Sequence, residues 1–321
     1  MPGNVSIERL FADIRNAMPG HVECFPHVCP CFSKGIFPRI RNLFDAAKHQ
    51  AQINHITGDV HYLAVALDKR RTLLTMHDCA SLERLSGWRR TVLLWLWYVL
   101  PIRRAGLVSV ISESTRRELL RHVKCDPSKI RVVPCCVGSD FAPVPKSFDE
   151  SDPVILQMGT AANKNLERVI EALAGLPCRL NIIGTLTVSQ RVRLEQHKIR
   201  YTNIPRATDA EVVSAYAACD MVIFASTYEG FGLPIVEANA VGRPVVTSNL
   251  LSMPEVAGQA ACLVDPFDVE AIRRGILKVW HEADYRDKLV AAGFENVKRF
   301  TAKAVAEEYT AIYTELAENK S

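Results

Sequence analysis

The sequence predicts two α/β domains, each built on a parallel β-sheet with helices on both faces. Short β-branched runs alternate with longer amphipathic stretches along most of the chain, which is typical of β-α-β units. The length of 321 residues and the hydrophobic fraction of 48% are sufficient for two separate cores. A segment rich in proline and acidic residues, at about Phe141–Pro153, interrupts the alternation and is the best candidate for a linker.

The first domain is expected to cover residues 1–145. Its opening helix is indicated by Ile7, Leu10, Phe11 and Ile14, which share one helical face. The strands expected after it are His21–Phe25, Ile53–Thr57, Thr72–Met76, Leu107–Ile111 and Ile130–Val133. A doubly wound domain normally opens with a strand, but this chain opens with a turn and a helix. The first strand is therefore missing from the pattern. Either the true start lies upstream, which we favour, or the sheet has lost one member.

The second domain is expected to cover residues 151–300 and repeats the scheme. Its expected strands are Val154–Met158, Arg179–Ile183, Ile199–Thr202, Met221–Ala225, Pro244–Thr247 and Ala261–Val264. Helical patterns lie between them at Asn165–Ala174, Ser189–His197, Asp209–Ala218 and Leu233–Val241. After Asp265 the pattern is helical to the end of the chain.

The charge and the cysteines of the chain indicate which ligands and metal sites to expect. A formal net charge of +4 suits an anionic ligand or an acidic membrane surface, and no nucleic-acid-binding signature is present. The ten cysteines stand in a long chain without a disulfide framework, which indicates reduced thiols and a cytoplasmic setting. His27, Cys29 and Cys31 form the tightest group of metal-ligand residue types. Because no second ligand pair follows at zinc-finger spacing, we expect no metal.

The strongest local signal is the segment Ser226–Glu237, where an apolar strand leads through glycines into a helix. Pro234 stands in the first turn of that helix, where proline is favoured. The amides of Phe231, Gly232 and Leu233 are expected at the helix start, which favours phosphate or sugar oxygens. Two carboxylates, Glu229 and Glu237, bracket these amides. The alternative is a tight strand–helix turn with two surface glutamates.

The segment resembles the Glu-x7-Glu signature of the family 4 glycosyltransferases, retaining enzymes of GT-B fold, over about fifty residues from YAACDMVIF to AACLVDP. The resemblance implies that Glu229 orients the transferred sugar and that Glu237 holds the ribose of the nucleotide. It also implies that the backbone from Gly230 to Leu233 contacts the donor, with the amides of Phe231 and Gly232 on sugar hydroxyls or phosphate.

A second similar segment, MGTAANKNLERVIEAL, begins at the end of the first strand of the second domain. In the family this loop carries a cation for the donor pyrophosphate, which here is Lys164, and the loop backbone at Gly159 and Thr160 is also expected at the donor. A fixed cation stabilises the charge that develops on the leaving phosphate. Many relatives add an arginine where this chain has Thr160 or Asn163. The alternative for Lys164 is a solvated lysine at a helix start.

The first domain contains a third similar segment, LLTMHDCAS. In relatives a histidine at this strand end, here His77, touches the donor sugar or the acceptor, and it can donate a hydrogen bond without acting as a base. The adjacent Asp78 is a candidate for the acceptor loop. Gly3 and Asn4 are further candidates, because their turn resembles the glycine-bearing loop that follows the first strand in GT-B proteins.

A basic and aromatic zone in the first domain has two interpretations. It contains Trp88, Arg89, Arg90, Trp95, Trp97, Tyr98, Arg103 and Arg104. Such a helix can rest on an anionic membrane surface. It can equally be buried against the sheet with its arginines reaching solvent.

The resemblance implies a retaining transfer of a sugar from a nucleotide-diphosphate sugar to a hydroxyl of a carbohydrate or lipid-linked acceptor, with no metal or other cofactor. The first domain is expected to bind the acceptor and the second the donor, with the C-terminal helix, 304–318, packing back onto the first domain. The setting is cytoplasmic, with the inner face of the membrane as a candidate location. A catalytically weakened binding or scaffold protein and a GT-B nucleotide-sugar epimerase stay open as alternatives.

Overall fold

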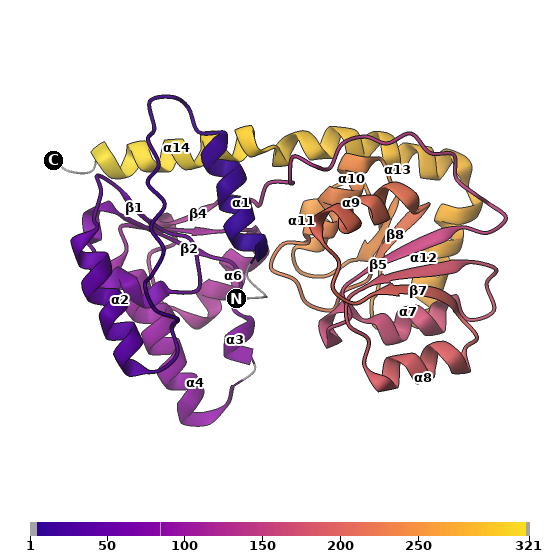
Figure 1. Cartoon of the computed structure of the whole chain (residues 1–321), viewed down its shortest axis with the longest axis horizontal. Helices are drawn as coiled ribbons and strands as arrows, with labels where there is room; N and C mark the ends of the chain where they lie inside the picture. Colours follow the sequence, from indigo (N-terminus) through magenta and orange to yellow (C-terminus); the bar gives the residue numbers. More distant parts are fainter. Residues whose placement is uncertain (1–4, 84, 319–321) are drawn as a thin grey trace. The chain divides into compact units, whose positions relative to one another are not determined.

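The computed structural model describes residues 5–83 and 85–318 and divides into two compact units. Unit 1 contains the chain up to Cys136 together with the segment from Ala302, and unit 2 runs from Val137 to Thr301 (Figure 1). Each unit contains one parallel sheet, as the sequence predicts. Among the described residues, none of the helices combines the length and apolar character needed to cross a membrane.

The sheet of unit 1 has four strands in the order β1-β2-β3-β4. These strands are β1 (Asn54–Ile56), β2 (Thr72–Met76), β3 (Leu107–Val110) and β4 (Ile130–Val132). The helices are α1 (Val5–Asn16), α2 (Ile36–Lys48), α3 (Ala80–Glu83), α4 (Gly87–Leu93), α5 (Leu100–Arg104), α6 (Glu113–His122) and α14 (Ala302–Glu318). The described part of the chain opens with α1, and Gly3 and Asn4 lie outside the described residues.

The two faces of this sheet are covered by different elements, because successive side chains of a strand point to opposite faces. Leu74 and Met76 of β2 belong to a core cluster that includes Ile102 of α5. Thr75, between them, is hydrogen-bonded to the His55 ring (2.6 Å) on the face covered by α1 and α14. These two helices pack against each other (Figure 1).

His55 connects α14 to the sheet of unit 1. Its second ring nitrogen, Nδ1, is hydrogen-bonded to the hydroxyl of Tyr313 on α14 at 2.7 Å. Burial, together with the neighbouring His77, lowers the pKa of His55 to about 3. The ring is therefore neutral near pH 7, so that one nitrogen donates and the other accepts.

The strand predicted at His21–Phe25 is wrong. Residues 17–35 contain neither helix nor strand, and the Phe25 side chain is 77% exposed. Pro26 and Pro30 lack the amide hydrogen that a paired strand would donate. The segment is instead fixed to α2 by Asn42, which is buried. Its side chain accepts a hydrogen bond from the Cys31 amide (3.1 Å) and donates one to the Cys31 carbonyl (2.8 Å).

The sheet of unit 2 has six strands in the order β10-β9-β8-β5-β6-β7. These strands are β5 (Val154–Met158), β6 (Arg179–Ile183), β7 (Arg200–Ile204), β8 (Met221–Phe224), β9 (Val245–Ser248) and β10 (Cys262–Val264). The helices are α7 (Leu166–Leu173), α8 (Val188–Gln196), α9 (Asp209–Ala218), α10 (Leu233–Val241), α11 (Met253–Ala257), α12 (Val269–His281) and α13 (Ala283–Asn296). Strands β5 and β6 and helices α9 and α10 match their predicted ranges, and β7, β8, β9, β10, α7 and α8 lie within two residues of theirs. Helix α11 was not among the predicted helices, and α12 and α13 lie in the region after Asp265 that was predicted to be helical.

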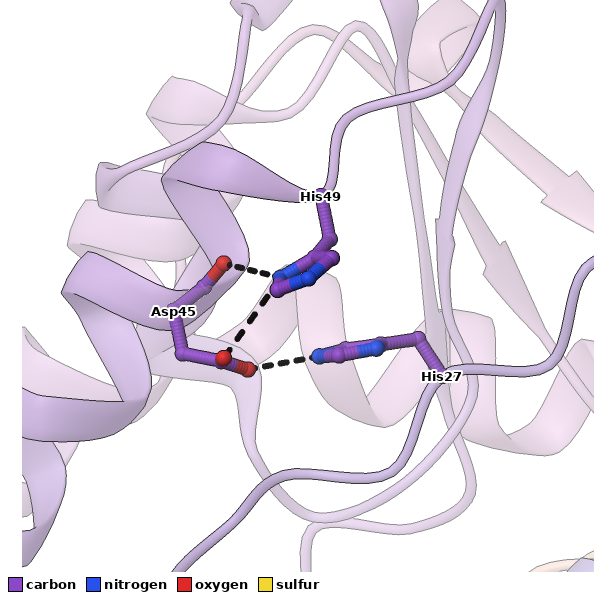
Figure 2. A group of neighbouring side chains, drawn as sticks. All are labelled: His27, Asp45 and His49. Carbon is purple, nitrogen blue, oxygen red and sulfur yellow. Dashed lines mark hydrogen bonds and ion pairs between the residues drawn. The ribbon is translucent and has the colours of Figure 1, made fainter.

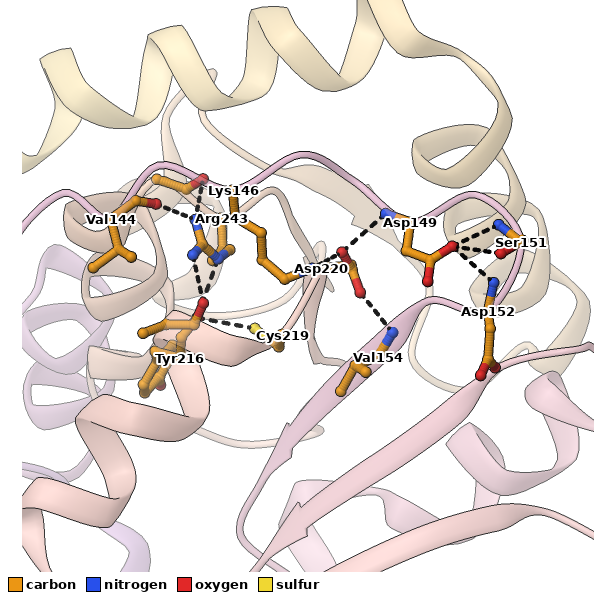
Figure 3. A network of polar contacts seen from close by, with 12 residues as sticks. Val144, Lys146, Asp149, Ser151, Asp152, Val154, Tyr216, Cys219, Asp220 and Arg243 are labelled. Atoms are coloured by element: carbon orange, nitrogen blue, oxygen red, sulfur yellow. Dashed lines mark hydrogen bonds and ion pairs between the residues drawn. The ribbon is translucent and has the colours of Figure 1, made fainter.

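The segment predicted as a linker, Phe141–Pro153, lies inside unit 2. Figure 3 shows it lying along Arg243 and Asp220. Arg243 donates to the carbonyls of Val144 (2.9 Å) and Ala217 (2.6 Å). The Asp220 carboxylate, which is buried, accepts from the Lys146 ammonium and from the amides of Asp149 (3.1 Å) and Val154 (2.8 Å). These contacts explain why the compact unit begins near Val137, before the composition changes.

We predict that Asp220→Ala lowers the free energy of unfolding of unit 2 by about 3–5 kcal/mol, because it leaves a lysine and two amides without their buried acceptor. Urea denaturation followed by circular dichroism measures this change. The matched control is Asp287→Ala on the exposed side of α13, with an expected change within about 0.5 kcal/mol. Equal urea midpoints for Asp220→Ala and the parent chain would contradict the stabilising role of the Asp220 carboxylate.

Candidate functional site

The predicted site residues of unit 2 lie on loops that follow two neighbouring parallel strands. Strand β5 pairs with β8, and their carboxyl ends lie at the same edge of the sheet. The loop after β5 carries Lys164, and the loop after β8 carries Glu229. Parallel strands bring such loops together.

Lys164 and Glu229 form an ion pair. The ammonium nitrogen lies 2.6 Å from Oε1 of the carboxylate, and the two side chains are 23% and 14% exposed. The ammonium also lies over the Phe224 ring at the end of β8, 4.8 Å from its centre. The sequence analysis assigned these two groups to different parts of a donor, and the structure brings them into direct contact.

Two backbone conformations position the lysine. Gly159 has a φ of +84°, and a Cβ at this position would lie 3.0 Å from Cγ of Lys164, so the lysine methylenes need a glycine there. Asn165 has a φ of 60° just before α7. Its side chain donates to the carbonyls of Ala225 (2.9 Å) and Pro266 (2.7 Å). These two contacts stabilise a conformation that is uncommon outside glycine.

Two residues that the sequence analysis did not select as site residues hold Glu229. The side-chain amide nitrogen of Asn163, Nδ2, donates to the Tyr228 carbonyl (3.0 Å) and to Oε1 of Glu229 (3.3 Å). The Ser252 hydroxyl donates to the Glu229 carbonyl at 3.0 Å. The loop after β8 is thus held by the loop after β5 on one side and by the start of α11 on the other.

Helix α10 begins at Leu233, as predicted. Its N-cap, Gly232, has a φ of 114°, and within the described residues no side chain caps the first turn. A helix start leaves backbone amides without intrahelical partners and carries a partial positive charge. This part of the loop from Gly230 to Leu233 is therefore suited to an anionic ligand.

Glu237 lies one turn inside α10 and is held by Tyr216 of α9. The tyrosine hydroxyl donates to Oε2 of Glu237 at 2.6 Å. Burial, with the adjacent Glu237 charge, raises the pKa of Tyr216 far above its usual value. The hydroxyl therefore stays protonated and fixes the carboxylate. The fold accounts for this contact, because α9 and α10 pack against each other.

Thr160 is engaged within unit 2. Its hydroxyl donates to the Thr185 carbonyl (2.7 Å), and its carbonyl accepts from the Gln190 side chain (2.9 Å). These bonds join the loop after β5 to the loop after β6 and to the first turn of α8. The Thr160 hydroxyl hydrogen is thus used internally, and only its oxygen can accept from a ligand.

In unit 1, His77 follows the end of β2, as predicted, and its ring is partly buried. Nε2 lies 2.9 Å from the Thr57 carbonyl, which can only accept, so Nε2 carries the proton. Burial lowers the pKa of His77, which keeps the ring neutral near pH 7. Nδ1 is then an acceptor, so in this tautomer the nitrogen left for a ligand cannot donate a hydrogen bond.

Asp78, next to His77, is exposed, and its carboxylate accepts from the Ala80 amide (2.9 Å) at the start of α3. Part of the basic and aromatic zone is buried and part is exposed. Tyr98 and Ile102 are buried in the core of unit 1, whereas Trp88 and Trp95 are 72% and 49% exposed. Among the described residues, the group with metal-ligand atoms close together is His27, Asp45 and His49, without the cysteines of the predicted cluster.

The comparisons with known proteins agree with this architecture. The family model described as "Glycosyl transferases group 1" matches residues 139–296, and "Glycosyltransferase Family 4" matches residues 12–141. The O-antigen chain mannosyltransferase B of Escherichia coli is 30% identical in an alignment 221 residues long, which covers 61% of this chain and 57% of that protein. The chain therefore spans little more than half the length of this curated relative.

Solved structures show the same fold. Sucrose-phosphate synthase from Thermosynechococcus elongatus matches with a TM-score of 0.79 and 18% identity, over 99% of this chain and 94% of that one. HepE of Anabaena in complex with UDP-glucose matches with a TM-score of 0.73 and 18% identity, over 87% and 82%. The two family matches together reach from residue 12 to residue 296, and the chain belongs to the group 1 glycosyl transferases of GT-B fold.

Proposed function

We propose that this protein transfers a sugar from a nucleotide-diphosphate sugar to a hydroxyl acceptor with retention at the anomeric carbon. The observation that carries the proposal is the ion pair of Lys164 and Glu229 in the loops beside the start of α10. A mannosyl donor and a cell-surface polysaccharide acceptor are the first substrates to test, because a relative at 30% identity is an O-antigen chain mannosyltransferase. HepE, of the same fold, has been solved with UDP-glucose.

The chemistry follows from charge. When the bond from the sugar to the diphosphate breaks, negative charge develops on the leaving phosphate. An ammonium already held in place and the amides at the start of a helix stabilise that charge without reorganisation. The diphosphate then competes with Glu229 for Lys164, and the carboxylate turns to the hydroxyls of the transferred sugar. We propose that no metal takes part in this step.

The remaining roles follow from hydrogen-bonding capacity. The Glu237 carboxylate, oriented by Tyr216, accepts from the ribose hydroxyls of the donor. His77 accepts a hydroxyl hydrogen through Nδ1, and unit 1 binds the acceptor. Gly3, Asn4 and Asp78 remain candidates for the acceptor loop.

Replacing Lys164 by alanine is predicted to lower turnover by an order of magnitude or more, because the transition state loses its fixed cation. Initial rates of donor cleavage, with a panel of donors that includes mannosyl and glucosyl nucleotides, measure the effect. The control is Lys288→Ala on the exposed side of α13, with turnover unchanged. Equal turnover in both variants would remove Lys164 from the mechanism. The anomeric configuration of the product, read by nuclear magnetic resonance, tests retention.

Donor affinity is predicted to fall about tenfold in Glu237→Gln, since the neutral amide accepts weaker hydrogen bonds than the charged carboxylate and has an N–H donor in place of one acceptor oxygen. Tyr216→Phe removes only the positioning hydrogen bond, so it is expected to weaken donor binding less. Isothermal titration calorimetry gives both values, with Lys288→Ala as the reference. Unchanged affinity in Glu237→Gln would exclude a direct contact with the donor.

The titration and the rate measurement together separate the alternatives. A scaffold protein would bind none of the donors in the panel. An epimerase would convert the donor with no acceptor present, whereas a transferase requires an acceptor for full turnover.

We also propose that unit 1 contacts an anionic membrane surface. Helix α2 exposes an apolar row of Ile36, Phe37, Ile40 and Phe44, and Phe37 is 86% exposed. Arg39 and Arg41 lie on the same helix, and Arg39 stacks on Trp97 at 4.5 Å, which joins α2 to the basic and aromatic zone. Apolar side chains flanked by arginines match the interface of an anionic bilayer.

Binding to vesicles of anionic lipid is predicted to fall at least tenfold in Phe37→Ser/Phe44→Ser, because two aromatic side chains no longer enter the interface. Both residues are largely exposed, so folding should be unaffected. Co-sedimentation with vesicles measures the change. Val188→Ser, an exposed site of unit 2, is the control. Equal binding to neutral and anionic vesicles, or no effect of the double substitution, would contradict the proposal.

A further inference from the structure

A group of metal-ligand side chains lies in unit 1, and the proposed transfer does not use it. It consists of His27 in the segment before α2, Asp45 on α2 and His49 at the end of α2. One ligand atom from each residue lies within 4.8 Å of the others. Figure 2 shows both imidazole rings beside the Asp45 carboxylate.

The carboxylate is already engaged by both rings. Nε2 of His27 lies 2.6 Å from Oδ2 of Asp45, and Nδ1 of His49 lies 3.4 Å from Oδ1. The two rings stack with centres 4.3 Å apart and planes inclined by 21°. The histidine side chains are 41% and 51% exposed, so an ion from solvent can reach the group.

The fold brings the three residues together with little freedom. Asp45 and His49 are four residues apart on one face of α2. The Nδ1 atom of His49 lies 2.8 Å from the Asp45 carbonyl, which fixes the ring at the helix end beside the Asp45 carboxylate. His27 lies in the segment before α2. The backbone of that segment is hydrogen-bonded at Cys31 to Asn42, which stands one helical turn before Asp45 on α2.

The chemistry of the set is specific. Two imidazole nitrogens and one carboxylate are the ligands that Zn²⁺ and related divalent ions prefer, and three protein ligands leave one position for water. Without an ion, exposed pairs of this kind contribute little to stability. Cys29, which the sequence analysis grouped with His27, packs against the core of unit 1 and is not in the ligand set.

We propose that His27, Asp45 and His49 bind one divalent transition-metal ion, with zinc as the matching chemistry. The ion would join residues 17–35, which contain no helix or strand, to α2. It would therefore stabilise unit 1 and take no part in sugar transfer.

The test is calorimetric titration of the chelator-treated full chain with ZnCl₂. The expected result is one ion per chain, with an affinity reduced at least tenfold in His27→Gln and in His49→Gln and lost in the double variant. His21→Gln, an exposed histidine of the same segment, should bind as the parent chain does. Cys29→Ser/Cys31→Ser should also keep the ion, which separates this site from a thiolate site.

Zinc should also raise the melting temperature of the parent chain but not that of the His27→Gln/His49→Gln variant. Circular dichroism without metal verifies that the variants are folded. Two outcomes would overturn the proposal. One is parent-like zinc binding by the double histidine variant. The other is loss of binding in the cysteine variant alone. Donor turnover is expected to be the same with and without zinc, so failure here leaves the transferase proposal untouched.

Discussion

The contact between the Lys164 ammonium and the Glu229 carboxylate is the interaction on which the candidate site depends. It joins two loops that are 65 residues apart in the sequence. It can form because β5 and β8 are adjacent parallel strands, so both loops leave the sheet at the same edge. Gly159 gives the lysine methylenes room, and Asn165 sets the direction of the chain after the lysine. A change in any of these residues moves the charged groups without removing them.

The pair also explains how the Lys164 ammonium stays charged and fixed in position without a ligand. An ammonium with its side chain only 23% exposed would lose hydration without a counter-charge, and Glu229 supplies that charge. In the proposed transfer, a diphosphate, which carries more negative charge than one carboxylate, displaces Glu229 from the lysine. The carboxylate is then free to accept from hydroxyls at the same point. One ion pair thus holds in place both groups that the proposal assigns to a sugar diphosphate, the ammonium for the phosphate and the carboxylate for the sugar hydroxyls.

The sequence predicted the elements and motifs well, because strand ends and helix starts are local features. Glu229 and the start of α10 were found from the local residue pattern, and Lys164 was found from the resemblance of its loop to the family segment. The partners Ser252 and Tyr216 were not, since their contacts depend on which helices lie side by side rather than on distance along the chain. The strand at His21–Phe25 failed for a related reason: its residue types favour an extended chain, but the segment pairs with no strand of the sheet. The group of His27, Asp45 and His49 was not predicted either, because His27 comes close to α2 only through the contacts of Asn42 with its segment.

The two units meet different physical demands. In unit 2, buried polar groups such as Asp220 and Arg243 fix even the irregular entry segment, and the charged pair is largely shielded from solvent. Among the described residues of unit 1, the three most exposed large apolar side chains, Phe25, Val28 and Phe37, lie on α2 and the segment before it. A chain that only needed to fold would cover these side chains or replace them with polar ones. Their exposure beside arginines therefore supports the proposal that unit 1 contacts an anionic membrane surface. The proposed stabilisation of the departing diphosphate belongs to unit 2, whose separate core allows each property to change without the other.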